Sequence, residues 1–188
     1  MDIDFLTLCL FLGINTILYM KKVTQEKWKD AATNLQNRRA SGNSGSGADL
    51  YKRILNMVHV GKTVLDVGCG SCYLKTILPE GVTYKGIDPF PTTKEVRKLT
   101  AEELKYLPPF AQTVFMMSAL DNVQNLKEAL EGLKKAAIGN IVILTGIGID
   151  PDQYHTVRVD REDLIEVLGE PHQEIYILPK VYLFEFFK

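Results

Sequence analysis

A short apolar run leads directly into a glycine-rich turn at Val64-Leu65-Asp66-Val67-Gly68-Cys69-Gly70-Ser71-Cys72. The β-branched character of the run from Thr63 to Val67 predicts a strand buried in a sheet. Gly68 and Gly70 let the backbone approach a ligand where a Cβ atom would clash. Because ligands of open α/β sheets bind at the carboxyl ends of the strands, we expect this turn to line a binding site.

An acidic residue follows at the end of the next predicted strand. Asp88 closes the apolar segment 82–87, about 20 residues after the turn, where a carboxylate accepts hydrogen bonds from ribose hydroxyls. The alternative is an aspartate that only terminates a strand. Dinucleotide-binding turns usually read G-x-G-x-x-G, but Tyr73 stands at the position of the third glycine. Together with Asp66, this difference argues against a nicotinamide-binding turn.

Strands and helices alternate along the rest of the chain. Further strands are predicted at 95–99, 113–117, 141–145, 174–178 and 181–187, and helices at 24–39, 48–58, 73–78, 101–106, 126–137 and 161–168. This alternation predicts a doubly wound α/β fold with a mostly parallel, seven-stranded, Rossmann-like sheet. The last two strands, joined by Pro179-Lys180, predict a C-terminal antiparallel hairpin.

Residues 1–22 form a separate apolar segment. Asp2 and Asp4 precede the apolar run 5–20, and Lys21 and Lys22 follow it. A signal peptide carries positive charge before its apolar core, and a membrane-spanning helix needs about 20 apolar residues. Three interpretations stay open: membrane association through residues 5–20, a helix that packs on the domain or on a partner, and an extension upstream of a start at Met20.

Residues 23–59 are predicted to form two helices around a glycine/serine-rich stretch at 41–47. Such a stretch has little intrinsic order and is typical of a linker. The alternative is a lid over the ligand that spans residues 28–47, with an amphipathic helix and the glycine/serine stretch, and in which Arg38 or Arg39 pairs with a carboxylate. The ligand-binding domain is then predicted to span residues 60–188.

Charge and cysteine content narrow the class of protein. The 188 residues contain 22 Lys and Arg against 23 Asp and Glu, a net charge of −1. Nucleic-acid binding is not expected, because phosphate recognition needs a basic excess. The three cysteines, Cys9, Cys69 and Cys72, predict a reducing, cytoplasmic location rather than a disulfide framework. Cys69 and Cys72 have C-x-x-C spacing, but no second Cys/His pair follows, so free thiols and no metal site are predicted.

The central stretch resembles the first motif of the class I S-adenosylmethionine-dependent methyltransferases, especially their type 11 group. That motif reads L-D-(hydrophobic)-G-x-G-x-G, and Leu65 to Cys72 match it with Cys72 in place of the third glycine. The resemblance covers residues 60–188. It implies S-adenosylmethionine as cofactor and a small-molecule, sugar or lipid-like methyl acceptor.

The resemblance also implies site residues. Cofactor contacts are expected from Asp66, Gly68, Cys69 and Gly70, from Asp88 and Pro89, from Ala101 and Glu102 beside the adenine, and from Ser118. Thr100 stands where an acid is usual. If the acceptor must lose a proton, Asp121 and His155 are the candidate catalytic bases, both expected on loops at the carboxyl ends of strands. Their alternatives are a turn residue and a surface histidine.

Two motifs of nucleic-acid methylation are missing from the sequence. The string Leu107-Pro108-Pro109-Phe110 precedes the fourth predicted strand and lacks the polar first residue of the (N/D/S)-P-P-(Y/F) motif, and no cysteine follows a proline. A small-molecule acceptor is therefore favoured. The departures at Thr100 and Cys72 keep an alternative open, a non-catalytic binding or scaffold protein with the same fold.

Overall fold

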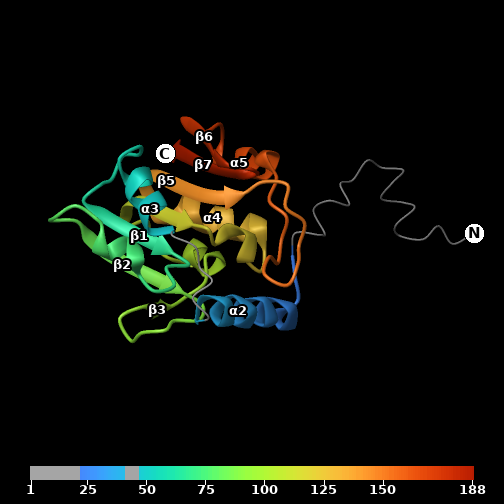
Figure 1. Ribbon diagram of the computed structural model, residues 1–188. Coiled ribbons are helices and arrows are strands. Elements are labelled where there is room, and N and C mark those ends of the chain that lie inside the picture. Colours follow the sequence, from blue (N-terminus) through green and yellow to red (C-terminus); the bar gives the residue numbers. More distant parts are fainter. Residues whose placement is uncertain (1–21, 41–46) are drawn as a thin grey trace, which may run out of the picture.

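The computed structural model describes residues 22–40 and 47–188, without the side chains of 36–40, 47 and 48. Seven strands form one mixed sheet in the order β3-β2-β1-β4-β5-β7-β6, with helices packed against it (Figure 1). The strands are β1 (Thr63–Val67), β2 (Thr83–Asp88), β3 (Arg97–Lys98), β4 (Ala111–Met117), β5 (Ala137–Gly146), β6 (Gln173–Leu178) and β7 (Val181–Phe187). The helices are α2 (Gln25–Ala40), α3 (Gly47–Leu55), α4 (Leu126–Ala136) and α5 (Arg161–Leu168). The predicted fold class is confirmed.

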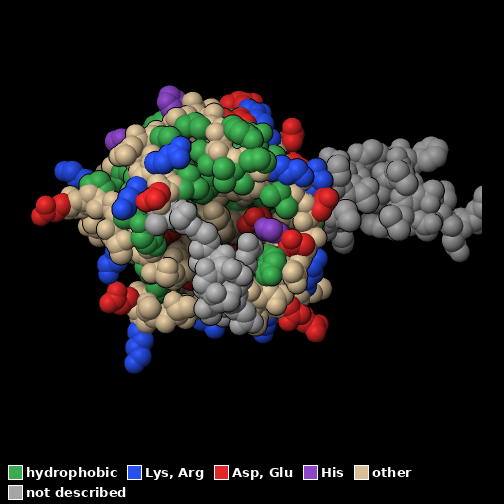
Figure 2. All heavy atoms as spheres, in the orientation of Figure 1, with side chains coloured by type: hydrophobic (Ala, Val, Ile, Leu, Met, Phe, Trp, Pro, Cys, Tyr) green, Lys and Arg blue, Asp and Glu red, His purple; other side chains and the backbone are tan. Residues whose placement is uncertain are grey.

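Parallel pairing joins β3, β2, β1, β4 and β5, whereas β7 runs antiparallel between β5 and β6. The predicted C-terminal hairpin is therefore present. Lys180, at its turn, has a φ of 63°. In β6, Ile175 and Ile177 face the core while Tyr176 and Leu178 are exposed, the alternation of an edge strand with one buried face. Figure 2 shows hydrophobic side chains gathered on the surface over these C-terminal strands.

The core lies on both faces of the central strands. In β4, Val114 packs in a cluster with Leu130 and Leu133 of α4, while Phe115 packs in a second cluster with Ile54 of α3. Successive residues of a strand point to opposite faces, so α3 and α4 cover opposite sides of the sheet. This double burial explains why the central strands read as continuous apolar runs.

Several elements differ from the sequence-based prediction. The helix expected at 73–78 is a single 3-10 turn, η2 (Tyr73–Thr76), and the strand expected at 95–99 is reduced to β3. The strand expected at 141–145 begins at Ala137, directly after α4. Residue 139 must be small there, because a Cβ atom on Gly139 would lie 2.5 Å from the carbonyl oxygen of Gln112. Close pairing with β4 thus extends β5 backwards through residues that have little strand character of their own.

The predictions for the apolar segment and for the glycine/serine stretch fall on residues 1–21 and 41–46, outside the described residues, as do the side chains of Arg38 and Arg39. Among the helices of residues 22–40 and 47–188, none has the length and apolar character needed to cross a bilayer.

Candidate cofactor and acceptor site

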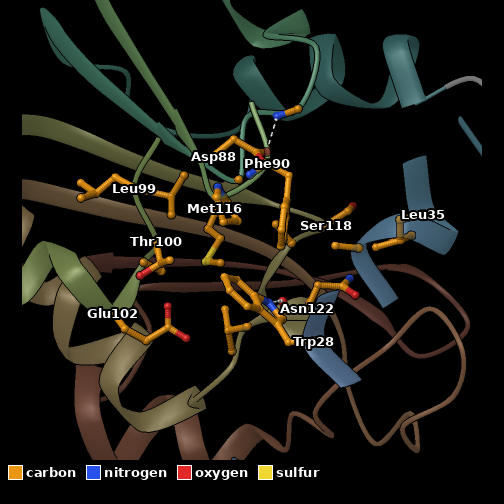
Figure 3. Close-up of a pocket in the computed structure, with 18 of the residues that line it drawn as sticks. Trp28, Leu35, Asp88, Phe90, Leu99, Thr100, Glu102, Met116, Ser118 and Asn122 are labelled. Atoms are coloured by element: carbon orange, nitrogen blue, oxygen red, sulfur yellow. Dashed lines mark hydrogen bonds between the residues drawn. The ribbon is translucent and has the colours of Figure 1, made fainter. Parts of the chain in front are cut away.

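A cavity of about 380 Å³ opens at the carboxyl ends of β1, β2 and β4 (Figure 3). Its walls come from the turn after β1, the end of β2, the residues after β3, the end of β4 and the helix α2. Of the residues predicted to contact a cofactor, the structure brings together in these walls Gly68, Gly70, Asp88, Pro89, Ala101, Glu102 and Ser118. Asp66 and Cys69 lie behind the turn and do not line the cavity.

The turn after β1 is held tightly against β2. The N–H groups of Gly68 and Cys69 both donate to the carbonyl oxygen of Ile87, at 2.9 and 3.1 Å. Gly68 has a φ of 71°, and a Cβ atom on it would lie 2.6 Å from the Cβ of Ala119. Glycine is therefore required here both by backbone conformation and by space.

Asp88 presents a carboxylate that is already oriented by the backbone. Its Oδ2 accepts a hydrogen bond from the N–H of Gly70 at 3.0 Å, drawn as a dashed line in Figure 3, and its Oδ1 accepts one from the N–H of Phe90 at 2.8 Å. Each oxygen keeps a free lone pair. The group can thus accept hydrogen bonds from a diol at the cavity wall.

Asp66 is a buried acid beneath the turn. The hydroxyl of Tyr84 donates to its Oδ2 at 2.8 Å, and only 4% of the residue is exposed. Burial raises the pKa of the Asp66 carboxyl to about 7, although the hydrogen bond from Tyr84 lowers it. From this position Asp66 contributes to the support of the turn.

Thr100 and Glu102 hold the segment after β3 in place. The N–H of Glu103 donates to Thr100 Oγ1 at 3.2 Å and the Glu103 carboxylate accepts from the N–H of Thr100 at 2.8 Å, beside η3 (Glu102–Tyr106). Glu102 Oε1 accepts from the N–H groups of Gln124 and Asn125, at 2.8 and 3.0 Å. Threonine at position 100 therefore forms a reciprocal pair of hydrogen bonds with Glu103 at the start of η3.

The helix α2 supplies a wall that the motif analysis missed. Trp28, Ala32 and Leu35 line the cavity from one face of this helix. Trp28 is only 6% exposed, and its ring lies 5.0 Å from the ring of Phe90, centroid to centroid. The shared face of Trp28 and Leu35 was readable from their helical spacing, and a lid over the ligand was one of the two alternatives predicted for residues 28–47, but neither side chain was named as a site residue.

Asn122, also missed, carries an unpaired acceptor. Its Nδ2 donates to Asp121 Oδ1 at 3.0 Å, and its backbone carbonyl accepts from Trp28 Nε1 at 2.8 Å. Its side-chain oxygen is buried and has no hydrogen-bond partner. The carboxylate of Asp121 fixes the amide orientation, because only the NH₂ group can donate to it. Figure 3 shows Asn122 beside Trp28 in the cavity wall.

The two candidate bases are brought together beside this site. His155 Nε2 lies 3.7 Å from Asp121 Oδ2, and His155 Nδ1 lies 2.8 Å from Asp152 Oδ1. Burial raises the pKa of the Asp121 carboxyl, and the neighbouring His155 lowers it in part. Neither Asp121 nor His155 lines the cavity. Asp121 is connected to the cavity wall through the amide of Asn122.

The structure resembles solved S-adenosylmethionine-dependent methyltransferases. It matches the 1,6-didemethyltoxoflavin-N1-methyltransferase of Burkholderia thailandensis, bound to 1,6-didemethyltoxoflavin and S-adenosylhomocysteine, with a TM-score of 0.67 and 13% identity over 88% of this chain and 91% of that chain. The chain has the class I methyltransferase fold.

Two further structures with this methyltransferase fold match at a TM-score of 0.56. The enzyme from Aquifex aeolicus is 19% identical, over 80% of this chain and 97% of that one, and the enzyme from Archaeoglobus fulgidus is 21% identical, over 74% and 94%. No protein-family model and no curated protein matches the sequence. At these identities the shared feature is the fold.

Proposed function

We propose that this protein binds S-adenosylmethionine in the cavity and transfers its methyl group to a small, largely apolar acceptor. The observation that carries the proposal is the Asp88 carboxylate, which two backbone N–H groups orient at the cavity wall opposite a glycine turn. A carboxylate held in this way suits the two hydroxyls of a ribose.

The charges of the cavity fit the same cofactor. Asp88 and Glu102 are the charged side chains among the described residues that line it, and no Lys, Arg or His of that part of the chain does so. S-adenosylmethionine supplies a methyl group on a positively charged sulfonium. An acidic cavity favours the binding of such a cation. Leu99, Ala101 and Met116 offer an apolar surface for the adenine.

The remaining walls support a neutral acceptor. Trp28, Leu35 and Phe90 form an apolar surface, and Asn122 Oδ1 offers one buried hydrogen-bond acceptor. This atom is buried, so a donor on the acceptor molecule would reach it only after a movement of the wall, and the bond would then offset the cost of burying the atom without a partner. The charged side chains among the described residues that line this cavity are all acidic. They would repel a phosphorylated or carboxylated acceptor, which is therefore disfavoured. The small molecule bound by the Burkholderia enzyme is in keeping with this class.

Positioning supplies much of the rate in this proposal. Methyl transfer needs the acceptor atom in line with the sulfonium methyl group, and a wall built by Trp28 and Phe90 excludes water from that line. If the acceptor atom loses a proton, His155 and Asp121 are the proposed receivers, with Asp152 orienting the imidazole at 2.8 Å. Because neither base lines the cavity, the proton would have to pass through a bridging group.

Calorimetry with S-adenosylhomocysteine tests the cofactor site. Asp88→Ala should weaken binding by about 1–3 kcal/mol, the scale of hydrogen bonds to a charged group. Glu80→Gln is the matched control, because Glu80 is an exposed acid just before the amino end of the same strand. Full affinity in Asp88→Ala, or no binding to the wild-type protein, would overturn the proposal. Binding without methylation of any acceptor in a metabolite screen would favour the non-catalytic alternative.

A further inference from the structure

The glycine turn separates the cofactor cavity from a second cavity. Gly68, Gly70 and Ser71 line the first, whereas Cys72 lines a second cavity of about 450 Å³ that shares only Leu99 with the first among the described residues. Lys75, Lys85 and Arg97 line this second cavity together with one acid, Glu95. A small anionic molecule can therefore approach Cys72 without entering the cofactor cavity.

The two thiols of the turn are close and free. Cys69 Sγ and Cys72 Sγ lie 3.7 Å apart, and no disulfide joins them in the structure. The N–H of Cys72 donates to the carbonyl oxygen of Cys69 at 2.8 Å, which closes a four-residue turn. The ends of such turns are less than about 7 Å apart at their Cα atoms, a separation that disulfides span. The sulfurs need to approach by less than about 2 Å to reach bonding distance.

The two sulfurs differ in access. Cys72 opens to the second cavity, whereas Cys69 packs against β2, where a Cβ atom on Gly86 would lie 2.9 Å from its sulfur. Burial, and then the charge of Asp66, raise the pKa of the Cys69 thiol above its ordinary value. Both side chains are half-buried, but Cys72 is the one that lines the second cavity, so it is placed to react first with an external reagent, and Cys69, whose thiolate is disfavoured, to react second with Cys72.

We propose that Cys69 and Cys72 form a reversible disulfide by exchange with a low-molecular-weight anionic disulfide, represented by oxidised glutathione. The Cys72 thiolate attacks one sulfur of the reagent, which forms a mixed disulfide and releases one glutathione thiolate. Cys69 Sγ then attacks Cys72 Sγ, loses its proton to solvent and releases the second glutathione. The two cysteines are oxidised by two electrons, and one glutathione disulfide is reduced to two thiols.

The test uses the full chain with Cys9→Ser, so that only the pair in the turn can react. After incubation with oxidised glutathione and acid quenching, mass spectrometry should show the loss of two hydrogen atoms, reversed by dithiothreitol. At equilibrium in a glutathione buffer, the ratio of disulfide to dithiol should exceed that of the guanidinium-unfolded chain by about tenfold or more, because the fold holds the sulfurs together.

Two single variants assign the roles. In the same background Cys69→Ser should accumulate one glutathione on Cys72, and Cys72→Ser should stay unmodified while folded. The inference is overturned if the wild-type pair stays reduced, if it accumulates the mixed disulfide without closing, or if it forms the disulfide no more readily than the unfolded chain. Each of these results is independent of whether S-adenosylhomocysteine binds.

Discussion

Two cavities meet at one turn, and they have opposite character. The first is lined by Asp88 and Glu102 and by the apolar side chains of α2, whereas the second is lined by Lys75, Lys85 and Arg97 with a single acid. The first favours a cationic cofactor and a neutral acceptor, and the second favours an anionic reagent. The difference shows how one short loop can present its glycines to one cavity and Cys72 to another.

The largest effect is expected at the first glycine of the turn, which lines the first cavity. Gly68→Val should abolish cofactor binding, because a β-branched residue is strained at a φ of 71° and its Cβ atom would clash with Ala119. Strain and clash each cost about 1–3 kcal/mol of folding stability. Chemical unfolding and calorimetry with S-adenosylhomocysteine measure the two losses.

Gly81→Val is the matched control. Gly81 has a φ of 82°, but a Cβ atom on it would meet no other atom within 4 Å. This variant should carry the strain alone and keep full cofactor affinity. If Gly68→Val and Gly81→Val lose equal amounts of folding stability and of cofactor affinity, the clash at the turn contributes nothing.

A second prediction concerns the acid between the cavities. The pKa of the buried Asp66 carboxyl is about 7, while an unfolded aspartate ionises near pH 4. Between these values the folded protein holds a proton that the unfolded chain has lost, so the free energy of unfolding falls as the pH rises from about 4 to 7. The fall attributable to Asp66 is at most about 4 kcal/mol, and it persists above pH 7.

Asp66→Asn should remove this part of the pH dependence. Urea unfolding of both proteins at a series of pH values provides the measurement. Parallel curves for Asp66→Asn and the wild-type protein would show that the carboxyl titrates normally. Tyr84→Phe should extend the fall in stability to higher pH, because it removes a hydrogen bond that favours the ionised form and so raises the pKa of Asp66 in the folded protein, while the start of the fall near pH 4 stays the same.

A smaller effect is expected for the residue that replaces the third glycine. Cys72 has a φ of 59°, a left-handed conformation that glycine adopts without strain. Cys72→Gly should therefore raise the free energy of unfolding of the reduced protein by about 0.5–1 kcal/mol. Lys180→Gly, at a φ of 63° in the hairpin turn, should give a similar gain. If Cys72→Gly lowers the free energy of unfolding while Lys180→Gly raises it, the packing of the Cys72 thiol contributes more than the backbone strain costs.

The smallest effect concerns the charge of the second cavity. Arg97→Gln should slow the reaction of Cys72 with oxidised glutathione by a few-fold at low ionic strength, and high salt should remove the difference. Stopped-flow or quenched mass spectrometry gives the rate. Arg53→Gln on α3 removes a positive charge outside that cavity and should leave the rate unchanged. A slowing that persists in high salt would point to a steric cause instead.

Local patterns predicted most of the fold. Successive apolar β-branched residues marked β1, a glycine pair marked its turn, and Pro179-Lys180 marked the hairpin, because burial, backbone conformation and turn chemistry act within a few residues. The prediction was less accurate where the conformation of a segment depends on the elements packed against it and not on its own sequence. The residues from Ala137 to Asn140 are strand because β4 pairs with them and β7 pairs with Asn140, and the helix expected after Cys72 is shortened to one 3-10 turn.

Seven of the nine residues predicted to contact a cofactor line the first cavity. The gathering of glycines and acids there was readable from the sequence, because they follow strands at characteristic spacings. The acceptor wall was not, since Trp28 and Asn122 are 94 residues apart and meet only through a hydrogen bond across the fold. Asp121 and His155 were both named from the sequence as candidate bases, but their contact with each other, and the cationic cavity beside Cys72, depend on the tertiary structure. The sequence by itself determined the strands, the turns and the order in which they follow one another. Only the tertiary structure decided which side chains share a cavity, because that depends on contacts between segments whose separation along the chain carries no local pattern.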